Sequence, residues 1–136
     1  MESKENLQTK IIQLDYLNQQ IKAMQLHLSD VEKAIDELSV LKVGLNNIGE
    51  AKKGDEVLVP LGASSYARAR LSSTEKVLVS IGAGVFVEKL VEEAVPIVER
   101  QVEELQRQEE MVIQNISLLN QEADSLAEEL NKEMKA

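Results

Sequence analysis

The sequence predicts an α+β protein in which a long antiparallel two-helix coiled coil is joined by two β-hairpins. The first observation is that apolar residues recur with a heptad period near both ends of the 136-residue chain, around a centre rich in valine and glycine. The second is a shortage of large side chains, because the chain has one Phe, two Tyr and no Trp. This length is typical of one domain, so we expect residues 1–136 to form a single domain.

The N-terminal arm follows a seven-residue frame that starts at Leu7, with only Lys10 and Lys42 as exceptions. The a positions are Leu7, Leu14, Ile21, Leu28 and Ile35, and the d positions are Leu17, Met24, Val31, Leu38 and Leu45. A heptad sustained over this length is typical of a coiled coil. The polar, glycine-containing segment 49–55 predicts the end of the helix, which we expect over 4–48.

The C-terminal arm repeats the pattern, with Glu109 and Glu133 as exceptions. The a positions are Val95, Val102, Ile116, Ala123 and Leu130, and the d positions are Val91, Val98, Leu105, Val112, Leu119 and Leu126. Pro96 falls inside this frame, so the helix either bends there or begins late with the proline in its first turn. Acidic residues suit an N-terminal turn, and we therefore expect a helix over 88–134 that bends near Glu92.

Between the arms, over 56–87, the apolar period changes to 2, which predicts two β-hairpins. The predicted strands are 56–61, 66–71, 76–81 and 85–87. A lone hairpin is marginal in water, so we expect these strands to pair with strands of other subunits. The residues that we expect to drive this assembly are Val57, Val59, Pro60, Gly62, Val77, Val79, Gly82, Gly84 and Phe86.

Charge and residue types argue against several functions. The net charge is −9, and residues 88–136 carry 13 acidic and 5 basic side chains, which would repel a nucleic-acid backbone. No apolar run is long enough to cross a membrane, and no cysteine is present, which suits a reducing compartment. We therefore expect a cytoplasmic protein with no nucleic-acid or membrane partner.

No catalytic or metal site is expected either. His27 is the only histidine, and no cysteine or second histidine is present to share a metal. It lies beside the stripe of a and d residues, which we call the heptad seam. The Gly82-Ala83-Gly84 segment lacks the lysine and the strand-to-helix context of a phosphate-binding loop, and it is predicted to be a turn. The sequence therefore predicts a protein that is not an enzyme and has no cofactor.

The centre of the chain carries a resemblance to a known family. Residues 59–66 (VPLGASSY), then 79–84 (VSIGAG) and 87–89 (VEK), resemble the two-hairpin region of the alpha class of prefoldin subunits in its archaeal form. Beta-class subunits carry one hairpin, and the two flanking arms extend the match over essentially the whole chain. Two features depart from the family: Ser64 stands where glycine is frequent, and Pro96 interrupts an arm that is usually smooth.

The resemblance implies an ATP-independent holdase chaperone of the cytosol. Similar proteins form a hexamer of two alpha-class and four beta-class subunits, whose hairpins build a double intersubunit β-barrel that carries six coiled coils. The tips of the coiled coils hold unfolded polypeptide clients and deliver them to a group II chaperonin.

Apolar residues outside the seam near the chain ends agree with a client-binding tip. Ile11, Ile12 and Tyr16 occupy positions that should be polar in a two-helix coiled coil. The residues expected to contact clients are Leu7, Ile11, Ile12, Leu14, Tyr16, Leu126, Leu130 and Met134. Further apolar residues outside the strict seam extend this surface inward or simply broaden the stripe: Leu26, Met111, Ile113 and Leu118.

Two other functions remain open from the sequence. The first is a structural subunit that uses the same hairpins to form a filament, because an interface that does not close can propagate. The second is a coiled-coil tether with one defined partner, which would leave the two hairpins without a role.

Overall fold

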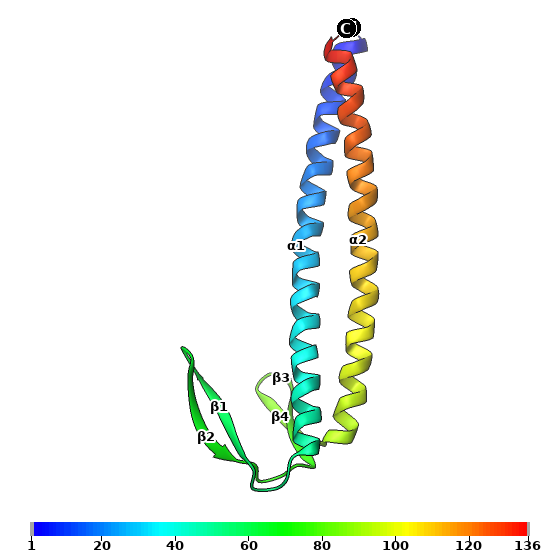
Figure 1. The fold of residues 1–136 in the computed structure, drawn as a ribbon. Helices are drawn as coiled ribbons and strands as arrows, with labels where there is room; N and C mark the ends of the chain where they lie inside the picture. The colour runs from blue at the N-terminus through cyan, green and yellow to red at the C-terminus, as the bar shows by residue number, and fades with distance from the viewer. Residues whose placement is uncertain (1, 136) are drawn as a thin grey trace. The chain divides into compact units, whose positions relative to one another are not determined.

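A computed structural model describes the backbone of residues 2–135 and the side chains of residues 4–135 (Figure 1). Its elements follow in the order α1 (Glu2–Glu50), β1 (Glu56–Gly62), β2 (Ser65–Arg70), β3 (Lys76–Gly82), β4 (Val85–Leu90) and α2 (Val91–Lys135). The strands form two separate antiparallel pairs, β1 with β2 and β3 with β4. The predicted fold class, two long helices joined by two β-hairpins, is confirmed.

The chain divides into two compact units. One unit combines the residues up to Ile35 with those from Glu104 onward, and the other spans Asp36–Glu103. In the first unit, α1 and α2 run side by side in opposite directions (Figure 1). Its buried side chains all occupy a or d positions of the two heptad frames: Ile21, Val31, Val112, Ala123 and Leu130. The heptads therefore build the seam that they predict.

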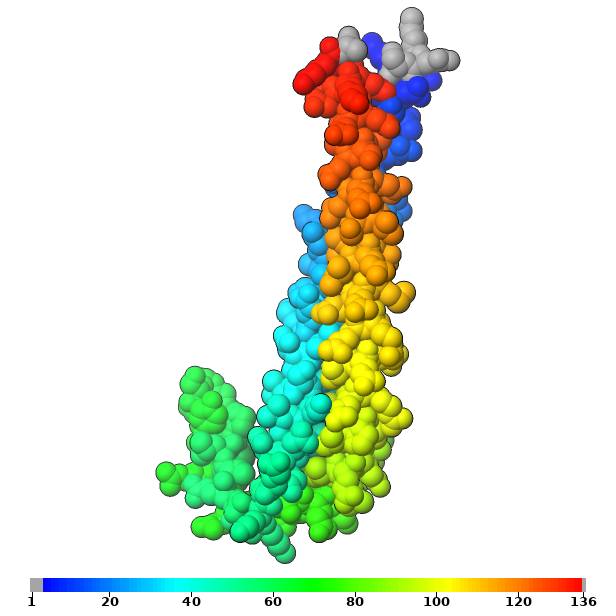
Figure 2. Space-filling model, turned by 45° about the vertical axis from the view of Figure 1, so that its right-hand side comes forward, coloured from blue at the N-terminus to red at the C-terminus, as the bar shows by residue number. Residues whose placement is uncertain are grey.

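The second unit has a small core where the two helices meet the hairpins. Leu45 of α1 packs in one cluster with three buried residues of α2, Val91, Ala94 and Val98. Val77 brings β3 against this cluster. Figure 2 shows the last part of α1 (cyan) packed against the first part of α2 (yellow). The second hairpin is thus attached to the helix ends through β3.

The boundary between β4 and α2 differs from the one expected from the sequence. Residues 88–90 belong to β4, and α2 begins at Val91, so the expected helix start at residue 88 is wrong. Glu88 pairs with Leu78 in the ladder, and the N–H of Val91 donates to the carbonyl of Glu75 at 2.8 Å. Strand pairing with β3 therefore outweighs the preference of acidic residues for a helical first turn.

Pro96 is the sixth residue of α2, so the alternative of a helix that begins late, with Pro96 in its first turn, is wrong. Glu92 and Glu93 occupy the first turn, as expected for acidic residues near a helix N-terminus. The proline removes only the hydrogen bond to the carbonyl of Glu92, at the edge of that turn. The helix continues past it to Lys135.

The two hairpins repeat one design at an offset of 20 residues, since Glu56 of β1 corresponds to Lys76 of β3. Each ladder has an irregularity one residue before its turn, between Pro60 and Gly62 or between Ser80 and Gly82. Each then closes through a two-residue loop, because Gly62 pairs with Ser65, and Gly82 with Val85.

The loop residues have left-handed backbones, as the mirror-image turns of tight hairpins require. In the first loop Ala63 has φ 48° and Ser64 has φ 61°, and in the second Ala83 has φ 51° and Gly84 has φ 74°. Serine carries a Cβ that disfavours this conformation, whereas glycine adopts it freely. The first hairpin therefore has the more strained turn.

Exchanging the residues at this loop position should change the stability of the hairpins in opposite directions. Ser64→Gly relieves the left-handed Cβ but adds backbone entropy to the unfolded chain, so we expect a gain of about 0.5–1 kcal/mol. Gly84→Ser should cost about 1 kcal/mol for the converse reason. Urea unfolding at one fixed protein concentration would measure both. Equal effects of one sign would contradict this account of the turns.

Candidate functional site

Exposed apolar side chains gather on both helices of the first unit. On α1, Ile11, Ile12 and Tyr16 are 50%, 69% and 60% exposed, and on α2, Leu118 and Met134 are 62% and 72% exposed. An open groove of about 830 Å³ lies between the two helices. Its apolar lining residues are Tyr16, Leu17, Leu118, Leu119 and Leu126. This groove offers an apolar surface with room for a side chain of another polypeptide.

The structure separates the predicted tip residues into two groups. Ile11, Ile12, Tyr16 and Met134 are exposed. The other four belong to the heptad seam: Leu7, Leu14 and Leu126 are half-buried and Leu130 is buried. Leu126 lines the groove as well as the seam, so the surface open to another polypeptide consists of the four exposed residues and the groove.

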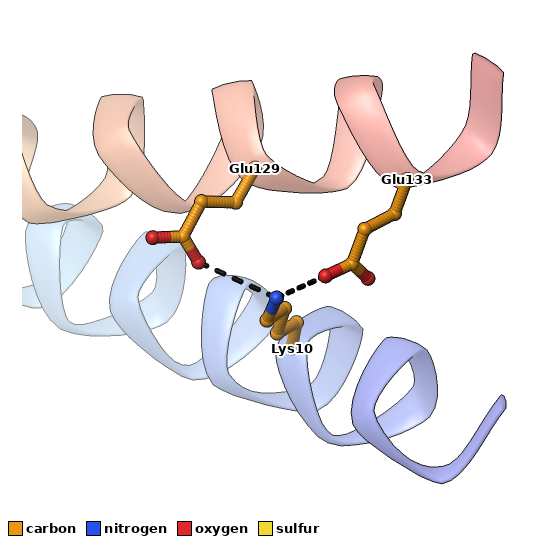
Figure 3. Close-up of polar contacts among 3 residues, drawn as sticks. All are labelled: Lys10, Glu129 and Glu133. Carbon is orange, nitrogen blue, oxygen red and sulfur yellow. Dashed lines mark hydrogen bonds and ion pairs between the residues drawn. The ribbon is translucent and has the colours of Figure 1, made fainter. Parts of the chain in front are cut away.

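A charged cluster joins the helices beside this surface (Figure 3). The Lys10 ammonium donates a hydrogen bond to Glu133, and its Nζ lies 3.5 Å from the Glu129 carboxylate. The hydrogen bond that Lys10 donates to the Glu133 carboxylate raises the pKa of Lys10 above its usual value, against the opposing effect of desolvation. Lys10 and Glu133 are two of the charged exceptions in the heptad frames, and the structure brings them together. The contact could have been predicted from the sequence, because Lys10 and Glu133 are oppositely charged residues at positions that the heptads otherwise fill with apolar residues.

A third exception is paired in the second unit, where Nζ of Lys42 lies 3.6 Å from the Glu99 carboxylate. Both partners are more than two-fifths exposed, so this ion pair contributes little to stability. Its effect is to place a charged contact at a position that apolar residues fill elsewhere in the seam.

The hairpins of the second unit present apolar residues on both faces. Val57, Val77 and Val79 are half-buried, and with the helix ends they line an open cavity of about 840 Å³. The remaining residues predicted to drive assembly are exposed: Val59, Pro60, Gly62, Gly82, Gly84 and Phe86. Large apolar side chains that are not among the predicted assembly residues are exposed too: Leu58, Leu61, Leu78 and Ile81.

An apolar patch on α1 was not predicted from the sequence. Val40, Leu41 and Val43 are 72%, 46% and 59% exposed, and none of them is an a or d residue. Leu41 lines the cavity beside the strands. The available signal was a run of three apolar residues interrupted only by Lys42, directly before Gly44.

Two kinds of site are not found in the described part of the chain. Among residues 2–135, no helix combines the length and apolar character needed to span a membrane. Within the same residues, no three His, Cys, Asp or Glu side chains are grouped as a metal site would require.

Comparison with known proteins agrees with the arrangement of helices and hairpins. The sequence model of the family described as "Prefoldin subunit" matches residues 13–136. Prefoldin subunit alpha of Methanococcus vannielii is 31% identical over 94% of this chain and 86% of its own length. A putative prefoldin subunit alpha of Aquifex aeolicus is 28% identical over 96% of this chain and 93% of its own length.

A solved structure has the same fold. It is the cryo-EM structure of filamentous PFD from Methanocaldococcus jannaschii, which aligns with a TM-score of 0.69 over 85% of this chain and 95% of the matched chain, at 23% identity. Members of the matched family are non-enzymatic chaperone components that assemble with other prefoldin subunits. With its two hairpins and its similarity to archaeal alpha subunits, the chain belongs to the prefoldin alpha subunit family.

Proposed function

We propose that the chain is the alpha-class subunit of an ATP-independent holdase, which binds unfolded polypeptides at its helix ends and passes them to a group II chaperonin. The observation that carries the proposal is the exposed apolar surface of the first unit. Contiguous apolar surface exposed to water is typical of a site that binds other polypeptides. The cytoplasmic location expected from the sequence stays a prediction.

The groove suits weak and unselective binding. Its apolar residues alternate with polar ones, among them Gln13, Gln121, Glu122 and Ser125, so a client can bury apolar side chains while its backbone remains solvated. Met134 adds a flexible side chain that fits partners of different shape. Such a surface holds an unfolded chain without selecting one sequence.

For assembly, we propose a hexamer of two alpha-class and four beta-class subunits, closed through the hairpins as a double β-barrel. The supporting observation is that both hairpins are two-stranded and expose large apolar residues such as Leu58, Leu78 and Phe86. Isolated two-stranded hairpins are at best marginally stable in water, so strands from other subunits would complete them.

A filament remains the second candidate. The structural neighbour with the same fold is a filamentous prefoldin, and hairpins whose contacts do not close on themselves would extend in one direction. Light scattering of the chain alone and with a beta-class subunit separates the two. A single hexamer mass in the mixture supports the holdase assembly, and long species of mixed length from the chain alone support the filament.

Polar substitutions at the exposed tip should weaken the holding of clients while leaving assembly intact. We expect the triple variant Ile11→Ser, Ile12→Ser and Tyr16→Ser to lose most of its suppression of aggregation of an unfolded client protein. The seam residues are untouched, so the oligomer mass should not change. Light scattering of the client at several chaperone ratios measures the first effect, and size-exclusion chromatography measures the second.

A matched control removes comparable exposed apolar surface from the same unit. The variant Leu26→Ser and Met111→Ser changes side chains that are 66% and 63% exposed, outside the groove lining. It should retain nearly normal holding. An equal loss in both variants would contradict a client site confined to the tip, and full holding by the tip variant would contradict the tip as the site.

A charge on the half-buried face of β3 should disrupt assembly. Val79 lines the cavity beside the helix ends, and Val79→Asp would place a carboxylate where strands pack together, at a large desolvation cost. We expect monomers that retain helical content by circular dichroism. Ser80→Asp, at an exposed neighbouring position, is the control and should be tolerated. An unchanged oligomer mass for Val79→Asp would contradict assembly through this face.

A further inference from the structure

The groove between the helices of the first unit is lined by negative charge and by no positive charge. Two of its lining residues are glutamates, Glu122 and Glu129, and none is a lysine, arginine or histidine. Lys10 partly neutralises Glu129, because its Nζ lies 3.5 Å from that carboxylate (Figure 3). Glu122 differs, since no cation among the side chains of residues 4–135 lies within ion-pair distance of its carboxylate. One carboxylate of the groove is therefore open to a bound polypeptide.

The sequence around Glu122 explains why no neighbour pairs with its charge. Residues three and four positions away share its face of the helix, and they are Leu118, Leu119, Ser125 and Leu126. None of them carries a positive charge, and all four also line the groove. Glu122 is itself exposed, so solvent reaches its carboxylate. The charge therefore stands within a largely apolar strip of α2.

The wall of the groove that α1 supplies contributes an aromatic ring. Tyr16 is 60% exposed and lines the groove together with Leu17. Nε2 of Gln20, one helical turn further along, donates a hydrogen bond to the Tyr16 hydroxyl at 3.1 Å, which holds the ring along the helix. An exposed aromatic ring attracts the charged head of a lysine or an arginine. Both walls thus favour a cation, α2 through Glu122 and α1 through Tyr16.

The surroundings of the groove have the same sign of charge. Residues 1–35 and 104–136, which form the first unit, carry 13 acidic and 7 basic side chains. The field of such a surface attracts positively charged segments before they make contact and repels negatively charged ones. Electrostatic attraction therefore acts on a client in the direction that the groove itself favours.

We propose that the groove prefers the basic segments of unfolded clients, with Glu122 as the residue that determines this preference. The inference rests on the proposed binding of clients at the helix ends and names the class of segment bound there. Lysine and arginine bury their aliphatic stems on apolar surface while the charged head stays at a polar rim. A client stem would lie on Leu118 and Leu126, with its head at Glu122 and Tyr16. The preference concerns charge and leaves the sequence open.

Segments of other composition would bind less well. An acidic segment would bring a like charge to Glu122, which is repulsive. A wholly apolar segment would cover the leucines but would also desolvate the Glu122 carboxylate without a partner, which costs free energy. A segment that mixes apolar and basic residues avoids both costs. Such mixed segments are therefore the class of client sequence that the groove fits best.

Binding of three matched peptides to the full-length chain tests the preference. The peptides share their length and apolar residues and carry Arg, Gln or Glu at the remaining positions, with a fluorescent label whose anisotropy gives the Kd. We expect the Arg peptide to bind about fivefold more tightly than the Gln peptide at low salt, and the Glu peptide to bind most weakly. Added salt should reduce these differences, because it screens exposed charges.

Substitutions at Glu122 connect the preference to the groove. Glu122→Gln removes the charge at nearly constant size, and it should bring the Kd of the Arg peptide to within about twofold of that of the Gln peptide. The Kd of the Gln peptide should not rise. Glu122→Lys should reverse the order, so that the Glu peptide binds more tightly than the Arg peptide. Glu122 lies outside the a and d positions, so the oligomer mass of both variants should be unchanged by light scattering.

Glu128→Gln is the matched control. Glu128 is exposed on the same helix and lies outside the groove lining, so its removal changes the net charge equally without altering the groove. The preference of about fivefold for the Arg peptide should persist in this variant. An effect of the overall charge would instead lower the preference to the same extent in Glu122→Gln and Glu128→Gln.

Three results would overturn the inference. They are equal Kd values for the Arg and Gln peptides, an equal loss of preference in Glu122→Gln and Glu128→Gln, and an unchanged peptide order in Glu122→Lys. Suppression of client aggregation by the same samples separates this inference from the proposed function. Normal holding without a charge preference leaves the holdase standing with a groove that ignores charge, whereas a chain that binds no peptide and holds no client overturns both.

Discussion

The open edges of the two hairpins are the constraint on which the rest of this structure depends. Each hairpin has only two strands, so each strand has one row of backbone groups that no other strand satisfies within residues 2–135. Apolar residues lie on both faces, and Leu58 and Leu78 remain more than three-fifths exposed. A sheet this small cannot bury such residues alone. Strands from other subunits are therefore expected to complete the hairpins, as in a family that assembles into oligomers.

In the helical seam, apolar packing and a few charged residues have different roles. Its buried residues are aliphatic, and the contact is continuous within each unit except where charged residues interrupt it. Lys10 and Lys42 lie at such interruptions and reach acidic groups on α2. Exposed ion pairs add little stability. A lysine that faces a glutamate in one alignment of the two helices would face a leucine in a shifted alignment, so the ion pairs disfavour shifted alignments. The exceptions thus help to fix which residues of α1 face which residues of α2.

Much of this arrangement could be predicted from the sequence, because the spacing of apolar residues distinguishes helices from strands. The heptads identified the buried seam residues, and the alternation at 56–61 and 76–81 identified strands. The start of α2 could not be predicted, because residues 88–90 suit a helix locally and become strand only by pairing with β3. The tip was predicted as one set of residues, yet Leu130 packs in the seam while Ile12 is exposed. Separating them requires knowing which face of each helix is covered, and the partner helix decides that.

The same surface chemistry cannot serve both client binding and assembly. Apolar contact is non-directional, so a surface made only of leucine, isoleucine and valine would bind unfolded chains and other subunits alike. At the first unit this lack of selectivity suits a holdase. At the hairpins it would be harmful, since an exposed strand edge accepts any extended chain. Directional backbone hydrogen bonds, and a proline at the β1 edge that cannot donate one, would provide the discrimination that apolar side chains lack. Selective assembly in this chain is therefore expected to depend on the backbone groups of the strand edges, although apolar burial supplies most of the stabilisation.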